Sequence, residues 1–164
     1  MEAAFRPVEE KDLVEINRIV NDFEVARYLT LIPPVSLEET RQHFAENKKL
    51  GNPWYTILVD GKIAGSFILR RQKGNNSHVA VFGINIDKPY WGHGVGAQAL
   101  AYAEEEGRKI GVKKLELEVV QENERAVSLY EKDGFTIEGC KRKHTFVDED
   151  YKDTLIMGKW IWSE

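Results

Sequence analysis

A glycine-rich segment, Trp91–Ala97, has the residue types best suited to binding a ligand. It follows an apolar run that ends at Ile86 and precedes a stretch through about Lys109 that we expect to be helical. Glycines let a backbone come close to a ligand, and free N–H groups at a helix start bind phosphate oxygens. His93 could add a donor or a positive charge. A glycine-rich turn that only packs a helix on a sheet has the same pattern, so this segment needs support from other residues.

Two familiar nucleotide-binding loops do not fit this segment. A Walker-type loop ends in Gly-Lys-Ser/Thr, and no such triplet follows the glycines here. A dinucleotide fingerprint of the Rossmann type usually occupies the first strand-to-helix turn, whereas a long N-terminal region precedes Trp91–Ala97. The segment therefore predicts a phosphate site of another class.

A second cluster lies between Glu118 and Phe135. Asn123 is expected to cap a helix and Gly134 to end it. Ala126 and Tyr130 fall on one side of that helix. A tyrosine in such a place is by default a core aromatic whose hydroxyl finds some partner.

Together the two clusters resemble the GNAT superfamily of acetyl-CoA-dependent N-acyltransferases. The loop pattern Gln/Arg-x-x-Gly-x-Gly/Ala is met by Gly94 and Gly96, with Trp91 departing from the usual Gln or Arg. The second pattern, Asn-x-x-Ala-x-x-x-Tyr-x-x-x-Gly-Phe, is met at Asn123, Ala126, Tyr130, Gly134 and Phe135. The resemblance runs from about His78 to Phe135, and its nearest branch is that of the bacterial amino-acid N-acetyltransferases.

The resemblance implies a site for acetyl-CoA between two strands. The pyrophosphate would bind the loop, the pantetheine arm would pair with the strand near Ile84 and Ile86, and Gly83 would permit a bulge or bend there. Cofactor contacts are expected at Ile84, Ile86, Trp91, Gly92, His93, Gly94, Val95, Gly96, Ala97, Asn123, Ala126 and Tyr130.

The same resemblance assigns Tyr130 as the proton donor to the leaving thiolate, with a backbone N–H around Ile86 stabilising the oxyanion. His78 is the candidate base, because an imidazole titrates in the useful range. Glu24 and Glu116 are other candidates for the base, whereas His43 and His144 are interpreted as surface residues. Cys140 is interpreted as an ordinary strand thiol rather than a nucleophile.

The periodicity along the chain predicts an α/β (α+β) fold over residues 1–164, a single domain with a mixed, mostly antiparallel sheet of about seven strands and helices on both faces. A helix is expected from Leu13 to Phe23, and Ser36 with Glu39 marks the start of a second helix. Predicted strands cover 5–8, 54–59, 62–71, 78–86, 114–120, 135–145 and 151–160.

Composition narrows the possible partners. The net charge of −4 disfavours broad nucleic-acid binding, and no apolar stretch approaches the length of a membrane span. One cysteine allows no internal disulfide, and the scattered His and Cys show no metal-ligand spacing. We expect a soluble protein of the cytoplasm without a metal, and a possible homodimer seam at Trp160 and Trp162.

The acceptor is predicted to be a small primary amine such as a free amino acid, attacked directly in a ternary complex. A protein N-terminus or a polyamine is the alternative within the enzyme class. A non-catalytic acyl-CoA-binding domain on the same fold is the alternative outside it, because fold alone does not settle function.

Overall fold

A seven-stranded mixed sheet runs through the molecule, and the computed structural model describes residues 1–163 of it. The strand order is β1-β2-β3-β4-β5-β7-β6. The strands are β1 Ala3–Pro7, β2 Trp54–Val59, β3 Lys62–Arg71, β4 Val79–Ile86, β5 Lys114–Val120, β6 Thr136–Val147 and β7 Asp150–Trp160. Only β4 and β5 pair in parallel, so the sheet is mostly antiparallel as predicted.

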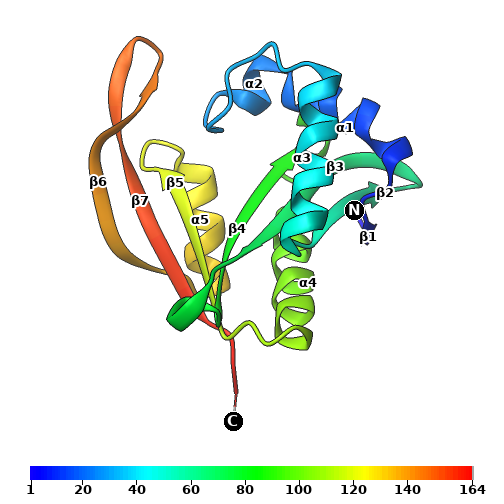
Figure 1. Cartoon of the computed structure of the whole chain (residues 1–164). Coiled ribbons are helices and arrows are strands. Elements are labelled where there is room, and N and C mark those ends of the chain that lie inside the picture. Colours follow the sequence, from blue (N-terminus) through cyan, green and yellow to red (C-terminus); the bar gives the residue numbers. More distant parts are fainter. Residues whose placement is uncertain (164) are drawn as a thin grey trace.

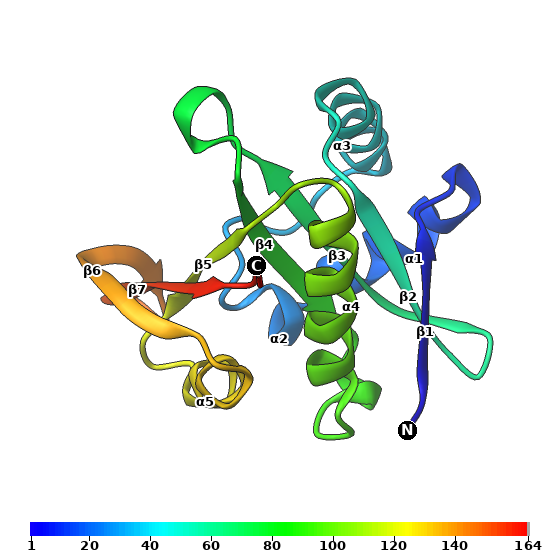
Figure 2. The same ribbon diagram turned by 90° about the horizontal axis from the view of Figure 1, so that it is seen from below.

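Helices cover both faces of this sheet, which also confirms the prediction (Figures 1 and 2). The longer helices are α1 Leu13–Val20, α3 Leu37–Leu50, α4 Val95–Lys109 and α5 Glu124–Asp133, and α2 is the short turn Phe23–Ala26. Helices α1, α2 and α3 pack on one face, where Leu13 and Ile16 form a small core with Leu37 and Phe44. Helices α4 and α5 pack on the other face, over the main core.

The helix starts follow local side-chain chemistry. Ser36 accepts from the Glu39 N–H at 3.1 Å and Glu39 accepts from the Ser36 N–H at 2.7 Å, the capping box that the sequence indicated. The helix expected from Leu13 to Phe23 is instead broken after Val20, because Asp22 caps a new start by accepting from the N–H groups of Glu24 and Val25. The break lets α2 turn back over the end of β4.

The C-terminal strands are longer than predicted. β6 continues to Val147 and β7 begins at Asp150, so only Asp148 and Glu149 make the turn. Both residues have positive φ, 52° and 60°, as a tight two-residue hairpin turn requires. β7 lies between β5 and β6, so it pairs with its hairpin partner β6 on one side and with β5 on the other.

The sheet is split in its middle. β4 and β5 pair only at Val79, Ala80 and Val81, opposite Lys114, Leu115 and Glu116. Beyond Val81 the two strands part, although β4 continues to pair with β3 as far as Ile86. This split, defined by Phe82–Ile86 on one side and Leu117–Val120 on the other, is the feature that positions the candidate site.

Candidate active site

The edge of β4 that faces the split carries free backbone groups. The Asp87 N–H donates to Ala64 O at the β3 side at 2.8 Å, and backbone groups of successive strand residues point to alternate sides. The backbone groups of Ile84 and Ile86 therefore point toward the split. This arrangement leaves room for an extended ligand arm as an additional strand, and the predicted contacts at these two residues stay a prediction.

The loop at the end of this edge leads into α4. Gly92 and Gly94 have φ of 74° and 78°, a left-handed backbone that other residues rarely adopt. Gly94 is the residue just before α4, and the Gln98 N–H, which donates to Gly94 O, is the first in the helix with a backbone acceptor. Within residues 1–163, the N–H groups of Gly92–Ala97 have no backbone acceptor.

These free N–H groups, together with the positive end of the α4 dipole, form an anion site. The side chains of His93 and Ala97 are exposed beside it, whereas the Val95 side chain turns into the core. A ligand at this loop would therefore meet backbone N–H groups, with the side chains of His93 and Ala97 beside them.

Trp91, the departure from the usual loop pattern, has a role that the sequence did not show. Its indole N–H donates to the carbonyl of Ile86 at 2.7 Å. That carbonyl is the last one on the split-facing edge of β4, so the indole closes the edge. Of the groups on this edge, the N–H groups of Ile84 and Ile86 and the carbonyl of Ile84 are left for a ligand.

Arg125 is a residue that sequence reasoning missed. Its guanidinium lies over the Trp91 ring, 5.7 Å from the centroid, and its side chain is exposed at the start of α5. The loop therefore has a cation beside it even though Trp91 replaces a Gln or Arg. No signal in the sequence pointed to this pair, because the two residues are far apart in the chain.

Tyr130 is buried on the face of α5 that packs on the main core. Its ring meets Phe135 edge-on at 5.8 Å, and burial alone raises the pKa of its hydroxyl to about 12. Asn123 caps α5 by accepting from the Ala126 N–H at 3.4 Å, which confirms its expected role as a cap. Ala126 is half-buried against the same core.

Gly96 sets the distance between the two helices at the site. A Cβ at this position would lie 2.9 Å from Leu129 Cδ2 and 3.7 Å from Ile86 Cδ1. Contacts this close leave no room for a side chain without movement of Leu129. Gly96 thus serves close packing of α4 against α5, while Gly92 and Gly94 serve the shape of the loop.

His78 does not join this group. It precedes Val79, where β4 and β5 are paired, and its carbonyl accepts from the N–H groups of Lys113 and Lys114. Its ring instead faces Trp160 at a centroid distance of 6.2 Å. Ile86 lies eight residues away along an extended strand, about 26 Å at 3.3 Å per residue. His78 is therefore at the opposite end of β4 from the loop, too far away to act as the base there.

The two alternative bases are both held by lysines. Glu24 is exposed on α2 and pairs with Lys88. Glu116 is half-buried on β5 at the last residue that pairs with β4, just before the split begins, and lies 4.0 Å from Lys114. The structure therefore singles out neither carboxylate as a free base.

A small pocket opens at the end of β5 on the α1–α3 face of the sheet. It is lined by Tyr28, Leu29, Thr30, Glu118, Val119, Val120, His144, Thr145 and Thr154. His144 was interpreted as a surface residue and is indeed exposed, yet it lines this pocket and its Nδ1 lies 3.3 Å from Thr154 Oγ1. Its placement depends on the β6–β7 hairpin register, which the sequence did not show.

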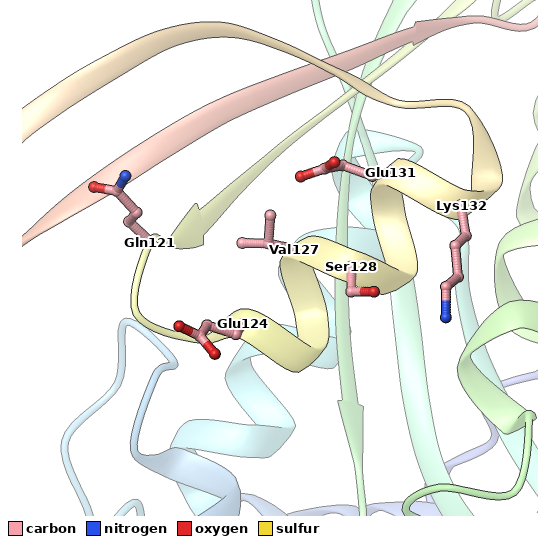
Figure 3. Close-up of a pocket in the computed structure, with 6 residues that line it drawn as sticks. All are labelled: Gln121, Glu124, Val127, Ser128, Glu131 and Lys132. Atoms are coloured by element: carbon pink, nitrogen blue, oxygen red, sulfur yellow. The ribbon is translucent and has the colours of Figure 1, made fainter.

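Another hollow, shown in Figure 3, lies along α5. Its lining residues are Gln121, Glu124, Val127, Ser128, Glu131 and Lys132. At 100° per residue these positions lie on a different side of α5 from Asn123, Ala126 and Tyr130. This hollow is therefore separate from the tyrosine side of the helix.

The remaining candidates lie elsewhere. Cys140 is exposed on β6, Trp160 is exposed at the end of β7, and Trp162 is half-buried beneath Lys113. A homodimer seam there stays a prediction. In the described part of the chain, residues 1–163, no cluster of His, Cys, Asp or Glu is arranged to hold a metal ion. No helix within that range is long and apolar enough to cross a membrane.

A sheet split beside a helix start with free N–H groups defines a site for a cofactor that has phosphates at one end and an extended arm. The chain matches the acetyltransferase (GNAT) family over residues 16–135. It therefore belongs to the acetyltransferase (GNAT) family and is an acetyl-CoA-dependent N-acetyltransferase.

Relatives and solved structures agree with this assignment. The chain is 28% identical over 160 residues to L-amino acid N-acetyltransferase AaaT of Escherichia coli, which covers 96% of this chain and 98% of that protein. It is 29% identical over 162 residues to Spermidine N(1)-acetyltransferase of Escherichia coli, covering 93% and 82%. The fold matches spermidine N-acetyltransferase from Vibrio cholerae, solved with CoA and spermine, with a TM-score of 0.88 at 23% identity over 96% and 95% of the two chains.

Proposed function

We propose that this protein transfers the acetyl group of acetyl-CoA to a small primary amine by direct attack in a ternary complex, with a free amino acid as acceptor. The observation that supports it best is the split between β4 and β5, which ends at the glycine loop and the start of α4. It offers a strand edge for an extended arm and an anion site for phosphates within one continuous feature.

In the proposed complex the pyrophosphate binds the N–H groups of Gly92–Ala97. The pantetheine arm pairs with the carbonyl of Ile84 and the N–H of Ile86, because the Ile86 carbonyl is already bonded to Trp91. Arg125 contributes a positive charge beside the phosphates. Asn123 and Ala126 line the α5 side of the arm.

In the proposed reaction the amine nitrogen attacks the thioester carbonyl carbon, and the backbone N–H of Ile84, the free donor of this edge that the arm does not use, stabilises the oxyanion. The carbon–sulfur bond then breaks, the nitrogen loses a proton to solvent, and Tyr130 protonates the departing thiolate. A thiol has a pKa near 8.5, well below the value of about 12 for Tyr130. The phenol is therefore protonated at neutral pH, and because proton transfer to a thiolate is uphill in free energy, it depends on the phenol being placed next to the sulfur. A proton from solvent then restores the phenol.

The charges beside the pocket favour an amino acid over a polyamine. Glu118 pairs with Lys141, and Glu122 lies 3.0 Å from Lys152. A polyamine needs free carboxylates for its several positive charges, and these two are already neutralised. A polyamine remains the second candidate because the spermidine acetyltransferase relative is as similar to this chain as the amino-acid acetyltransferase.

Measured turnover separates an acetyltransferase for small amines from the two remaining options, a protein N-terminal acetyltransferase and a non-catalytic acyl-CoA-binding domain. Release of CoA thiol is followed with acetyl-CoA and, in turn, free amino acids, spermidine and short peptides. Acetylation of peptide N-termini without activity on any free amine contradicts the proposed acceptor. Cofactor binding without turnover on any of these amines indicates a non-catalytic acyl-CoA-binding domain instead.

Ala97 provides a direct test of the anion site, because its exposed side chain lies in the first turn of α4. Ala97→Glu puts a carboxylate beside the helix dipole and should stabilise the free protein by about 0.3–1 kcal/mol relative to Ala97→Gln. The same carboxylate repels the pyrophosphate, so the rise in melting temperature caused by CoA should shrink in Ala97→Glu but persist in Ala97→Gln.

Thermal melts of both variants with and without CoA measure the two effects. Equal CoA responses in the pair would contradict the phosphate assignment, and no CoA response in the wild type would contradict the proposed function as a whole. Gly94 is a poorer place for this test, because any side chain there is strained at φ 78° even without a ligand.

A further inference from the structure

Arg70 on β3 lies across the backbone of β4. In the sheet register Arg70 is opposite Val81 and Ile68 is opposite Gly83. A Cβ on Gly83 would come within 3.1 Å of Arg70 Nη1, so the missing side chain leaves the space that the guanidinium occupies. The register shows no bulge at Gly83, one of the roles that the sequence allows for a glycine in a strand. The glycine instead makes room for Arg70.

This position is on the α1–α3 face of the sheet, at the start of the split. Side chains alternate along a strand, so Arg70 shares its face with Ser66, whose register partner is Asn85. Gly83 lies two residues beyond Val81, the last residue of β4 that pairs with β5. In the register Arg70 is level with Glu116, through Val81, and its guanidinium reaches one step further, to Gly83.

Arg70 is a cation without a protein partner in the described residues 1–163. No carboxylate lies within ion-pair distance of it, and no side-chain hydrogen bond of its guanidinium is found there. The Arg70 side chain is exposed, so its guanidinium is open to a ligand, and the protein around it nevertheless desolvates the guanidinium enough to lower its pKa. The nearest β5 carboxylates on this face, those of Glu116 and Glu118, have Lys114 and Lys141 as partners instead.

We propose that Arg70 binds the carboxylate of the acceptor, and that this contact makes the enzyme select small amines that carry a carboxylate. The inference rests on the proposed acetyl transfer and specifies its acceptor. A guanidinium binds a carboxylate in a bidentate manner, which fixes both position and orientation. The same cation repels a polyamine.

The spacing fits an α-amino acid, in which one carbon separates the carboxylate from the amine. A carboxylate held above Gly83 places the amine about one strand residue away, next to Ile84. The backbone of Ile84 belongs to the edge at which the proposed acetyl-bearing arm pairs. Binding the carboxylate therefore orients the nucleophile at no cost to the cofactor contacts.

The experiment compares matched acceptors. The L-amino acid that releases CoA thiol fastest with the wild type is assayed beside its own carboxamide and beside spermidine. In Arg70→Gln we expect KM for the free amino acid to rise about ten- to a hundred-fold, with kcat changed less than about three-fold. The KM values for the carboxamide and for spermidine should stay unchanged or fall.

Two further variants complete the design. Gly83→Ala should displace the guanidinium and raise KM for the free amino acid in the same direction but by less. Arg71→Gln is the matched control, because Arg71 donates to the carbonyl of Ile110, away from the split, and it should leave all three acceptors unaffected.

The proposal is overturned if Arg70→Gln leaves KM for the free amino acid unchanged, or if it raises KM equally for the carboxamide. It is also overturned if the wild type acetylates carboxamides or spermidine but no free amino acid. In each of these outcomes CoA binding and turnover persist, so acetyl transfer itself still stands. Loss of the CoA-dependent thermal shift in the wild type is the separate result that contradicts the proposed function.

Discussion

The two faces of the sheet differ in how their side chains are arranged. On the α4–α5 face, Phe67, Phe82, Leu117 and Met157 form one continuous apolar core. On the α1–α3 face the apolar cluster is small, and polar side chains are bonded to one another across the strands. Asp12 is bonded to Thr56 at 2.9 Å, and Ser66 to Asn85 at 3.0 Å.

This difference separates two tasks. The α4–α5 face fixes the loop and Tyr130 by close packing, as a site of fixed shape for the cofactor requires. The α1–α3 face carries charged and polar groups with spare binding capacity, such as Arg70 and the buried, unpartnered Oδ1 of Asn85. Substitutions on the first face should affect cofactor chemistry and stability, and those on the second should affect the choice of acceptor.

The largest expected effect is on the α4–α5 face, at Tyr130. Tyr130→Phe keeps the ring against Phe135 and removes only the hydroxyl, so kcat should fall by about 10²–10⁴ while CoA affinity changes little. Tyr55→Phe is the matched control. Tyr55 is also buried in the main core and its pKa is also raised to about 12, but its hydroxyl faces Glu106.

Steady-state kinetics, CoA titration and melting temperature on both variants decide the matter. If Tyr130→Phe turns over within a few-fold of the wild type while remaining folded, Tyr130 is not the acid. A comparable loss in Tyr55→Phe would show that the effect comes from core packing rather than from proton transfer.

A second effect concerns alkaline stability. Desolvation raises the pKa of Tyr130 and, ahead of a smaller contribution from Glu106, that of Tyr55, each to about 12. The unfolded value is near 10, so the stabilisation from these neutral phenols is complete below pH 10 and is lost as pH rises toward 12. The loss should be at most about 2–3 kcal/mol for each tyrosine.

Urea unfolding at a series of pH values from 8 to about 12 measures this slope. The slope should be shallower in Tyr130→Phe and in Tyr55→Phe, because each lacks one of the two phenols. An identical slope in the wild type and both variants would show that other groups govern alkaline unfolding.

The smallest expected effect is at Arg125, at the rim of the α4–α5 face. Arg125→Ala removes an exposed cation from beside the loop, so the Kd for CoA should rise by only about three- to ten-fold, and less at high salt. Arg142→Ala, at an exposed arginine on β6, is the control. Calorimetric titrations at two salt concentrations give both comparisons, and equal Kd values for the two variants would exclude Arg125 from the phosphate site.

Local signals predicted much of the fold. The capping box at Ser36, the Asn123 cap and the Gly134 end of α5 are set by neighbouring residues, so sequence spacing was enough to find them. The break between α1 and α2 was missed because Leu13 to Phe23 keeps its apolar spacing through Asn21 and Asp22. There the Asp22 cap overrides the periodicity.

The site was predictable only where a motif was continuous in the chain. The loop and the Asn123–Tyr130 helix were found because their residues are neighbours in sequence. His78 was chosen for its chemistry, and the strand direction places it at the paired end of β4. The contacts of Trp91 with Ile86 and of Arg70 with Gly83 depend on strand register and tertiary packing, which no local pattern encodes.

The split between β4 and β5 also has a consequence for how the molecule holds together. The sheet has two parts, strands β1 to β4 and strands β5, β7 and β6. In the described residues these parts are joined through the sheet by only three residue pairs between β4 and β5, so few backbone hydrogen bonds link them. A ligand arm lying along Phe82–Ile86 would act as an eighth strand on that edge and extend the seam between the two parts. With the cosubstrate bound as proposed, each catalytic cycle would add a strand to this edge of the sheet and then remove it.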